Sequence, residues 1–410
     1  MMYNVLRNES YDFLGTSYAA LYPNLHKYPA TMLPQIGIKL FKDFDIKAKS
    51  LLDPYCGSGS SFIVGSDVGI KVMSGFDLNP LAVLISKVKF TQLDIDRLTS
   101  IQISLRNDIY DFIKDERNIS QIQVPTFNNI DFWFSKHAII SLSVIKTFIE
   151  KIEDIDYRRF FLLPFSETAR ECSYTRNNEF KLYRMKEQDT LLFNPDIYGL
   201  YFYKLQSTLH IYTHYYLPKL KYIEAIEIEN TAFYEKDKKW DVVLTSPPYG
   251  DSRTTVAYGQ FSFFGNHWIG IKDARKLDNK LMGGTSTKNL YLQGVMQDYI
   301  SQIAKQSMKR ALEVSSYYFD LQTSIQKIAN AINFSGYSIY IVGNRCVKGV
   351  ILPTDQFIAE QFELNGLKHL ITFERLIGNK SMPSKNSPSN ITGNKMHTMT
   401  KEYIVICKKC

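Results

Sequence analysis

A short apolar run that ends in two consecutive prolines constrains the fold of this chain most strongly. The run begins at Trp240, continues as DVVLT and stops at Ser246-Pro247-Pro248-Tyr249. An unbroken apolar run with β-branched residues is typical of a strand buried on both faces of a parallel sheet. Proline lacks an N–H group and has a fixed φ, so the two prolines end the strand in a rigid turn. We therefore predict a strand over 241–244 whose carboxyl end holds a ligand, as in open α/β sheets.

The turn carries groups suited to a planar base with an exocyclic amine. The lone pair of such an amine is conjugated into the ring, so the nitrogen is a poor nucleophile until acceptors hold its N–H groups. Ser246 and the carbonyl of Pro247 are candidate acceptors, and Tyr249 is a candidate stacking surface. The structural alternative is a proline-rich turn with a packed tyrosine, because short motifs need their context to be confirmed.

The motif Thr245-Ser246-Pro247-Pro248-Tyr249 resembles the catalytic motif of the DNA amino-methyltransferases. In that family, serine in the first position is associated with cytosine, whereas Asp or Asn is commoner in adenine enzymes. The resemblance implies that Ser246, Pro247, Pro248 and Tyr249 are catalytic. It also implies a base that rotates out of the duplex and receives the methyl group directly, without a covalent enzyme–base intermediate.

A second strand-to-helix turn lies at 50–60, with the sequence SLLDPYCGSGS. Gly57 and Gly59 let the backbone pass close to a ligand, and the following helix offers unpaired N–H groups. The spacing is neither G-x-G-x-x-G nor a Walker motif, which disfavours dinucleotides and triphosphates. It resembles the D-P-x-x-G-S-G motif of the same methyltransferases and so implies S-adenosylmethionine as the cofactor, with Asp53 and Pro54 in its site.

Two further segments support this cofactor site. Asp77 follows the apolar run 70–76, where a carboxylate can hold both ribose hydroxyls, although it can also be a helix N-terminal carboxylate. The segment His26 to Ala30 resembles an H-x-Y-P segment that closes over the methionine part of the cofactor in this family. The predicted cofactor-binding residues are Tyr28, Pro29, Asp53, Pro54, Gly57, Gly59, Asp77 and Asn79.

The middle of the chain is predicted to be a mostly helical insert that recognises the target. Helix-period apolar residues occur over 94–114, 139–152 and 200–217. Between these helices, the stretch 166–184 is rich in Arg, Lys, Ser, Thr, Asn and Tyr, side chains that contact phosphates and base edges. A solvated surface loop is the alternative. The candidate DNA-binding residues are Arg170, Arg176, Lys181, Arg184 and Arg253, with Arg176 as the base reader.

The C-terminal part is predicted to complete the sheet. We expect a helix over 308–334, a strand over 337–343, a helix over 353–365 and a pair of strands over 370–376 and 402–407. The polar loop 378–400 resembles the variable region of the family that faces DNA. The resulting fold is a Rossmann-like α/β methyltransferase fold with a seven-stranded sheet, divided into 1–95 (cofactor part), 96–236 (helical insert) and 237–410 (catalytic part).

Composition indicates the general class of protein and its possible partners. Of 410 residues, 45% are hydrophobic and 22% charged, as in ordinary globular proteins. The polar N-terminus and the lack of a long apolar segment favour a cytoplasmic protein without membrane contact. Five scattered cysteines argue against a disulfide framework, and His210 and His214 lack companions for a metal site, so we expect no metal. The net charge of +8 permits a nucleic-acid partner.

These observations lead to one functional prediction. The chain is expected to be an S-adenosylmethionine-dependent methyltransferase that acts on the exocyclic 4-amino group of cytosine in duplex DNA. The resemblance implies a restriction-modification system with a cognate restriction endonuclease as a further partner. The alternatives are an adenine amino-methyltransferase, an RNA methyltransferase or a catalytically silent DNA-binding subunit.

Overall fold

The computed structural model describes residues 3–16, 21–29, 31–176, 179, 181–234, 237–251, 258–272, 274–378, 385–386, 396–397 and 399–410. Its centre is an eight-stranded sheet with the order β1-β9-β12-β6-β5-β2-β3-β4. The strands are β1 (Val5–Arg7), β2 (Ser50–Asp53), β3 (Val72–Phe76), β4 (Ala225–Glu229), β5 (Trp240–Thr245), β6 (Ile332–Val342), β9 (Leu367–Leu376) and β12 (Lys401–Lys409). Strand β12 is antiparallel to both of its neighbours, and the other pairs are parallel.

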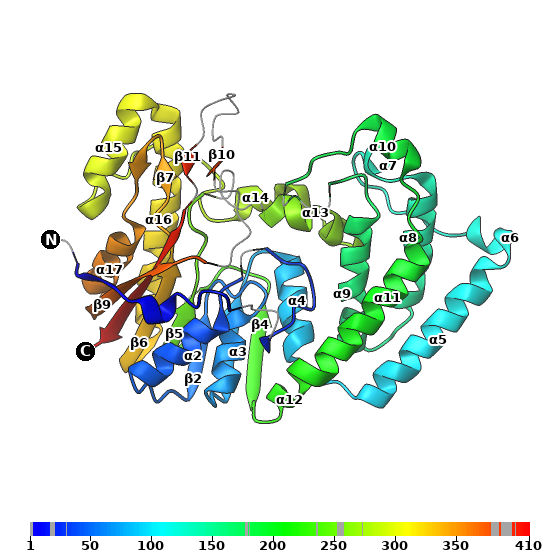
Figure 1. Cartoon of the computed structure of the whole chain (residues 1–410), viewed down its shortest axis with the longest axis horizontal. Helices are drawn as coiled ribbons and strands as arrows, with labels where there is room; N and C mark the ends of the chain where they lie inside the picture. The colour runs from blue at the N-terminus through cyan, green and yellow to red at the C-terminus, as the bar shows by residue number, and fades with distance from the viewer. Residues whose placement is uncertain are drawn as a thin grey trace.

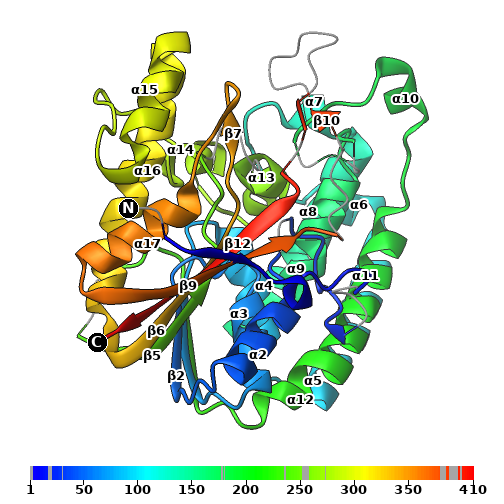
Figure 2. The same ribbon diagram turned by 60° about the vertical axis from the view of Figure 1, so that its left-hand side comes forward.

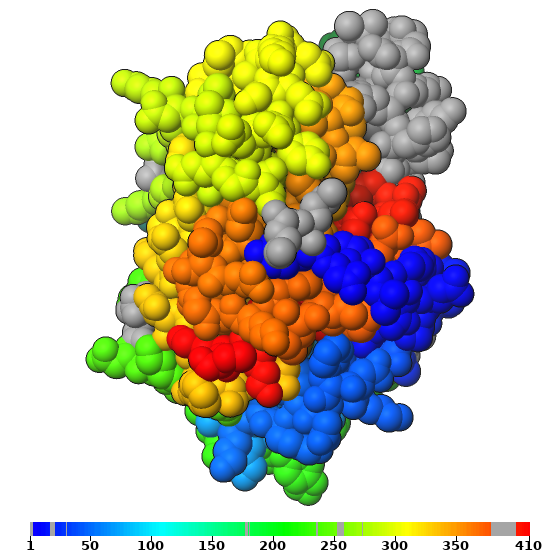
Figure 3. Space-filling view, turned by 90° about the vertical axis from the view of Figure 1, so that its left-hand side faces the viewer, coloured from blue at the N-terminus to red at the C-terminus, as the bar shows by residue number. Residues whose placement is uncertain are grey.

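The predicted Rossmann-like α/β fold is confirmed, but the sheet has one strand more than the seven predicted. The additional strand is β1, which pairs in parallel with β9 at the sheet edge. Figure 3 shows the N-terminal residues in blue lying against the orange residues of the C-terminal part. Three residues are too short a run for a period-two pattern to be recognised in the sequence.

Both faces of the sheet are covered by helices, as the apolar run of β5 requires. Val242 and Leu244 lie in one buried cluster, whereas Val243 lies in the other. One cluster includes α2 (Pro34–Asp43), α3 (Ser60–Asp67) and α4 (Pro80–Phe90), and the other includes α15 (Gln297–Gln306), α16 (Met308–Asn330) and α17 (Thr354–Leu364). Figure 2 shows the sheet between these two sets of helices. Successive side chains of a strand point to opposite faces, so both sets are needed to bury it.

A helical block extends from the β3–β4 side of the sheet (Figure 1). Its helices are α5 (Ile95–Ile113), α6 (Glu116–Ile119), α7 (Ile130–Trp133), α8 (Lys136–Glu150), α9 (Ile155–Glu171), α10 (Glu187–Leu192), α11 (Ile197–Ile211), a π-helical turn (Tyr212–Tyr216) and α12 (Leu217–Leu220). Asp94, Ser135, Asp154 and Asp196 cap four of these helices through their side-chain oxygens.

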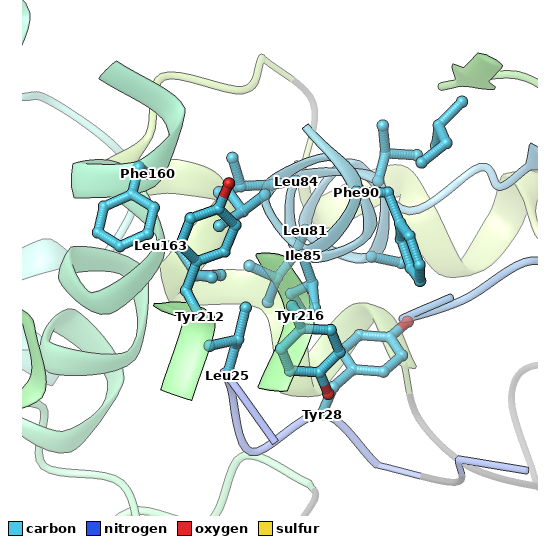
Figure 4. Packing of buried hydrophobic residues seen from close by; sticks show 14 of the residues in the cluster. Leu25, Tyr28, Leu81, Leu84, Ile85, Phe90, Phe160, Leu163, Tyr212 and Tyr216 are labelled. Carbon is cyan, nitrogen blue, oxygen red and sulfur yellow. The ribbon is translucent and has the colours of Figure 1, made fainter. Parts of the chain in front are cut away.

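The block and the sheet share one hydrophobic core. Figure 4 shows side chains of α4, among them Leu81 and Leu84, together with Leu25 and Tyr28 of the N-terminal loop and Phe160 of α9. All of these residues belong to a single buried cluster. The helical block is therefore packed onto the cofactor half of the protein.

Several boundaries differ from the sequence prediction, and three of the differences change the assignment of a segment. Ser166–Glu171 form the end of α9 and not a loop, because Ala169 and its neighbours are buried against other helices. Strand β4 lies inside the range 96–236 yet pairs with β3, so the sheet extends into the predicted insert. The predicted helix 308–334 ends at Asn330, since β6 begins at Ile332 and pairs with Trp240.

The remaining elements are two helices, three 3-10 turns and two pairs of short strands in the described residues. They are α13 (Tyr258–Trp268), α14 (Leu277–Lys280), the 3-10 turns Glu9–Tyr11, Ala274–Lys276 and Gly294–Met296, the hairpin of β7 (Cys346–Val347) and β8 (Val350–Ile351), and the pair of β10 (Lys385–Asn386) and β11 (Met396–His397). Most of the predicted DNA-facing loop 378–400 lies outside the described residues, as does Arg253. No helix in the described parts of the chain has the length and apolarity needed to cross a membrane.

Candidate active site

A cavity of about 360 Å³ lies where β2, β3 and β5 end. Both sequence motifs contribute to its wall, because neighbouring parallel strands bring their carboxyl ends to one edge of the sheet. The predicted residues that line it are Tyr28, Asp53, Pro54, Gly57, Asp77, Asn79, Ser246 and Pro248. The other four predicted catalytic and cofactor-binding residues are next to lining residues along the chain, namely Pro29, Gly59, Pro247 and Tyr249.

Asp77 is the acidic residue at the end of β3. Its two carboxylate oxygens accept the backbone N–H groups of Gly57 at 2.9 Å and Asn79 at 2.7 Å. Burial raises the pKa of this carboxyl to about 6, although both backbone hydrogen bonds oppose the rise. Asp77 therefore fixes the glycine turn and retains lone pairs that can accept hydroxyl groups.

Asp53 connects the cofactor motif to the catalytic strand. It accepts hydrogen bonds from the hydroxyls of Ser61 and Thr245 and from the backbone N–H of Tyr55 at 3.0 Å. Burial raises its pKa to about 6 as well. Because Thr245 directly precedes Ser246, Asp53 fixes the start of the predicted catalytic turn, Ser246–Tyr249, relative to the predicted cofactor loop.

The glycine turn is held from behind by α4. Ser86 Oγ donates to the carbonyl of Gly57 at 2.7 Å, and Lys89 Nζ donates to the carbonyl of Ser58 at 2.8 Å. Lys89 is buried, which lowers its pKa to about 7. Gly59 has a φ of +83°, and a Cβ atom there would lie 2.9 Å from Phe90, so this position requires glycine.

Tyr28 lines the cavity and comes from the N-terminal part of the chain. Its hydroxyl accepts from Asn79 Nδ2 at 3.0 Å, and its ring stacks on Tyr258 with the centroids 6.0 Å apart. Asn266 Nδ2 donates to Asn79 Oδ1 at 3.2 Å. Tyr258 and Asn266 both belong to α13, so this helix contacts the cofactor residues directly.

The catalytic turn is fixed by neighbouring hydroxyl groups. Ser246 Oγ lies 3.2 Å from the hydroxyl of Tyr249, which donates to Glu402 Oε1 at 3.0 Å. Tyr317 of α16 donates its hydroxyl to the carbonyl of Pro248 at 2.7 Å. Desolvation and the nearby carboxylate raise the pKa of Tyr249 well above its ordinary value, so its phenol stays protonated. The turn is thus rigid before any substrate binds.

Part of the cavity wall was not recognised in the sequence. Thr231, Ala232 and Phe233 line it from the loop after β4, and Phe233 packs edge-on against Phe76 at 5.2 Å. Other lining residues come from the α14 region and from α16, namely Lys280, Leu281, Met282, Asp320, Thr323, Ser324 and Lys327. The one available signal was the alternating sequence AIEIE of β4, which lies within the range predicted as helical.

The predicted DNA-contacting residues have different environments. Arg170 is buried and donates to the carbonyls of Phe261 at 2.9 Å and Glu179 at 2.7 Å, and burial lowers its pKa to about 10. The prediction that Arg170 lies on a DNA-facing loop is therefore wrong, because the residue ties α9 to α13 inside the protein.

Arg253 aside, the other three predicted residues lie within 175–184, and the end residues of this segment, Thr175 and Arg184, are joined by an antiparallel bridge. Residues 177, 178 and 180 lie outside the described residues. Arg176 and Lys181 are exposed on this 175–184 loop. Arg184 is partly buried, donates to the carbonyl of Phe132 at 2.9 Å and lies over the Phe132 ring at 4.5 Å. The loop is fixed to α13, since the backbone N–H of Leu182 donates to Gln260 Oε1 at 3.3 Å.

Comparison with known proteins decides the family. No protein-family model matches the chain. The Type II methyltransferase M.MvaI of Kocuria varians is 37% identical over an alignment of 432 residues, which covers 98% of this chain and 94% of that protein. The chain belongs to the Type II methyltransferases. It is thus a site-specific DNA methyltransferase, and S-adenosylmethionine is its methyl donor, as predicted.

More distant similarities were also found for this methyltransferase. The Type II methyltransferase M.MjaII of Methanocaldococcus jannaschii is 23% identical over 195 residues, or 46% of this chain and 34% of that protein. The structures of TehB from Haemophilus influenzae and of the rRNA methyltransferase aviRa from Streptomyces viridochromogenes give TM-scores of 0.30 and 0.28 at 8% and 10% identity. The alignments cover 94% of this chain in both cases, and 65% and 88% of those chains. The family assignment rests on the first relative.

The cavity fits the methyl donor of this family. Asp77 offers carboxylate acceptors for ribose hydroxyls, and Phe233 and Leu78 offer apolar surface for a base. Gly57 has a φ of +48°, and a Cβ atom at this position would meet nothing closer than the Tyr55 carbonyl at 4.0 Å, so the turn is open where it lines the cavity. When bound, S-adenosylmethionine supplies an electrophilic methyl group on a sulfonium centre. In the described ranges, no cluster of His, Cys, Asp and Glu is suited to a metal ion.

Proposed function

We propose that this methyltransferase modifies the exocyclic 4-amino group of cytosine in duplex DNA. The observation that supports this most is the position of Ser246. Ser246 directly follows β5, lines the cavity and precedes the Pro247-Pro248 turn. A neutral hydroxyl and a backbone carbonyl in this position can accept the two N–H groups of an amine and so direct its lone pair away from the ring.

The reaction then needs mainly positioning. One N–C bond forms, the S–C bond of the donor breaks, and one amine proton is released to water. The turn contributes by holding the nitrogen in line with the methyl group, an effect worth several orders of magnitude in rate when the reacting atoms are well oriented. An amine inside a duplex cannot reach the cavity, so we propose that the cytosine rotates out and stacks on Tyr249.

A covalent enzyme–base intermediate is not part of this proposal. Cys56 lies in the turn itself and contributes to the cavity wall, and its buried side chain packs against Gly75 of β3. Burial raises the pKa of its thiol well above the ordinary value, so the nucleophilic thiolate is suppressed. Direct transfer therefore agrees with the chemistry of the residues present.

We further propose that the 175–184 loop docks DNA through Arg176 and Lys181, and that Arg184 supports the loop. Both exposed cations lie on a loop that is anchored to α13, the helix whose Tyr258 lines the cavity. Positive side chains next to the reaction site attract phosphates. We also propose, as a further partner, a restriction endonuclease that reads the same DNA site.

The test is to identify the methylated base. Plasmid DNA treated with the enzyme and S-adenosylmethionine is digested to nucleosides and analysed by mass spectrometry. We expect 4-methylcytosine from the wild type and from Cys56→Ala, and none from Ser246→Ala at matched protein concentration. Methylated adenine or ring-methylated cytosine as the product would refute the assignment.

A further inference from the structure

The catalytic tyrosine is bonded to a buried ion pair on the last two strands of the sheet. Glu402, at the start of β12, accepts the hydroxyl of Tyr249 with Oε1, and its Oε2 accepts from Arg375 Nη1 of β9. Arg375 is 2% exposed and Glu402 3% exposed. A buried ion pair is costly to desolvate and is a weak source of stability, so its position beside the catalytic turn suggests another role.

The arginine of this pair is itself held in place. Its Nε donates to the carbonyl of Tyr11 at 2.7 Å, and its Nη2 donates to the carbonyl of Asp12 at 3.1 Å. The guanidinium group can only donate hydrogen bonds. Glu402 thus faces a donor on one side, and its other carboxylate oxygen is an acceptor aimed at Tyr249.

This arrangement determines where the hydroxyl protons lie. The phenol of Tyr249 has one proton, which it donates to Glu402. In the 3.2 Å contact between the two hydroxyl groups, the proton must then come from Ser246 Oγ. With its proton directed at Tyr249, Ser246 presents its lone pairs as acceptors.

We propose that Glu402, supported by Arg375, is a positioning residue that orders these protons so that Ser246 accepts an N–H group of the target amine. The inference rests on the proposed function, because a serine acceptor is needed only if an amine is the substrate. Glu402 itself touches neither substrate nor cofactor in this account.

Two variants test the order of the protons. In Glu402→Gln, the amide oxygen must face Arg375, so the amide N–H₂ faces Tyr249, and Tyr249 then donates to Ser246. The proton order is reversed, and Ser246 directs its own proton at the amine. In Tyr249→Phe, the ring remains for stacking, but the link to Ser246 is lost. We expect kcat to fall roughly 10- to 100-fold in each variant, as for the loss of one charge-assisted hydrogen bond, with the KM for DNA nearly unchanged.

A double variant separates ordering from structural damage. In the Tyr249→Phe background, Glu402→Gln has no hydroxyl left to reorder, so the double variant should have the kcat of Tyr249→Phe alone. If the double variant instead loses kcat by the product of the two single losses, Glu402 acts independently of Tyr249, and the proposal is overturned. Wild-type kcat in Tyr249→Phe would also overturn it, even if Glu402→Gln fails to fold.

Matched controls lie on the same two strands. Tyr403 of β12 contacts Glu374 of β9 through its hydroxyl at 3.4 Å, away from the catalytic turn. Tyr403→Phe and Glu374→Gln should retain wild-type kcat, and losses equal to those of the site variants would overturn the proposal. Rates are measured as incorporation of labelled methyl groups, whichever base receives them. A wild-type product methylated on the amine of adenine would therefore refute the cytosine assignment and leave the proton-order test readable, because the acceptor still faces an amine. Ring-methylated cytosine would overturn both proposals.

Discussion

At the scale of single residues, Asp77 gives the most direct test of the predicted cofactor site. Both of its oxygens already fix the glycine turn through Gly57 and Asn79. Asp77→Ala should weaken S-adenosylmethionine binding by about 1.5 to 3 kcal/mol, the value of hydrogen bonds to a charged group. Calorimetric titration measures this, with the exposed Asp108→Ala on α5 as the control. An unchanged affinity in Asp77→Ala would remove this residue from the site.

The raised pKa values of Asp53 and Asp77 predict a pH dependence of cofactor binding. Both carboxyls have a pKa of about 6, mainly because of burial. A cationic ligand favours their charged forms, so binding lowers these pKa values and releases protons. The affinity should therefore rise as the pH increases from about 5 to 7 and level off above. Titrations in buffers of different ionisation enthalpy measure the released protons, and a pH-independent affinity would contradict the prediction.

At the scale of elements, the 175–184 loop gives a prediction about DNA. Arg176→Ala should weaken DNA binding, because this exposed cation is fixed near α13. If Arg176 only touches phosphate, all sequences weaken alike and the salt slope falls by about one, whereas a base contact costs about 1 to 3 kcal/mol at one position. Arg117→Ala on α6 removes another exposed cation, at the far end of the helical block in Figure 1, and should change neither quantity. If Arg176→Ala and Arg117→Ala have the same DNA affinity and the same salt slope, the 175–184 loop does not take part in DNA binding.

Some helices and strands could be predicted from the sequence and others could not. The strands β2 and β5 and the residues of their turns were predicted, because apolar runs that end in Gly or Pro are determined locally. The end of α9 was missed because Arg170 and Ser166 look like loop residues, and only their packing against α13 keeps them buried. Glu402 was missed as well, since its partner Tyr249 lies 153 positions away and no local pattern marks such a pair.

At the scale of the whole molecule, the shared core predicts cooperative unfolding. The chain has three tryptophans, of which Trp133 lies in the helical block and Trp240 in the sheet. One buried cluster joins the block to the cofactor half. A variant that retains only Trp133 and one that retains only Trp240 should therefore show the same urea transition when tryptophan fluorescence is followed. Leu84 packs in the cluster drawn in Figure 4, so Leu84→Ala should lower the free energy of unfolding obtained from both transitions by about 2 to 5 kcal/mol. Two separate transitions would mean that the block folds independently.

The bonds from Arg375 to Tyr11 and Asp12 have a consequence for the time at which the enzyme becomes active. Arg375 and Tyr11 are 364 positions apart, and Glu402 follows still later. Synthesis proceeds from the N-terminus, so Tyr11 is made long before Arg375 and Glu402. The segment around Tyr11 must therefore wait for β9 and β12 before the network behind Tyr249 can close. A nascent chain whose cofactor loop has already formed lacks that network until Glu402 has been added and β12 has paired.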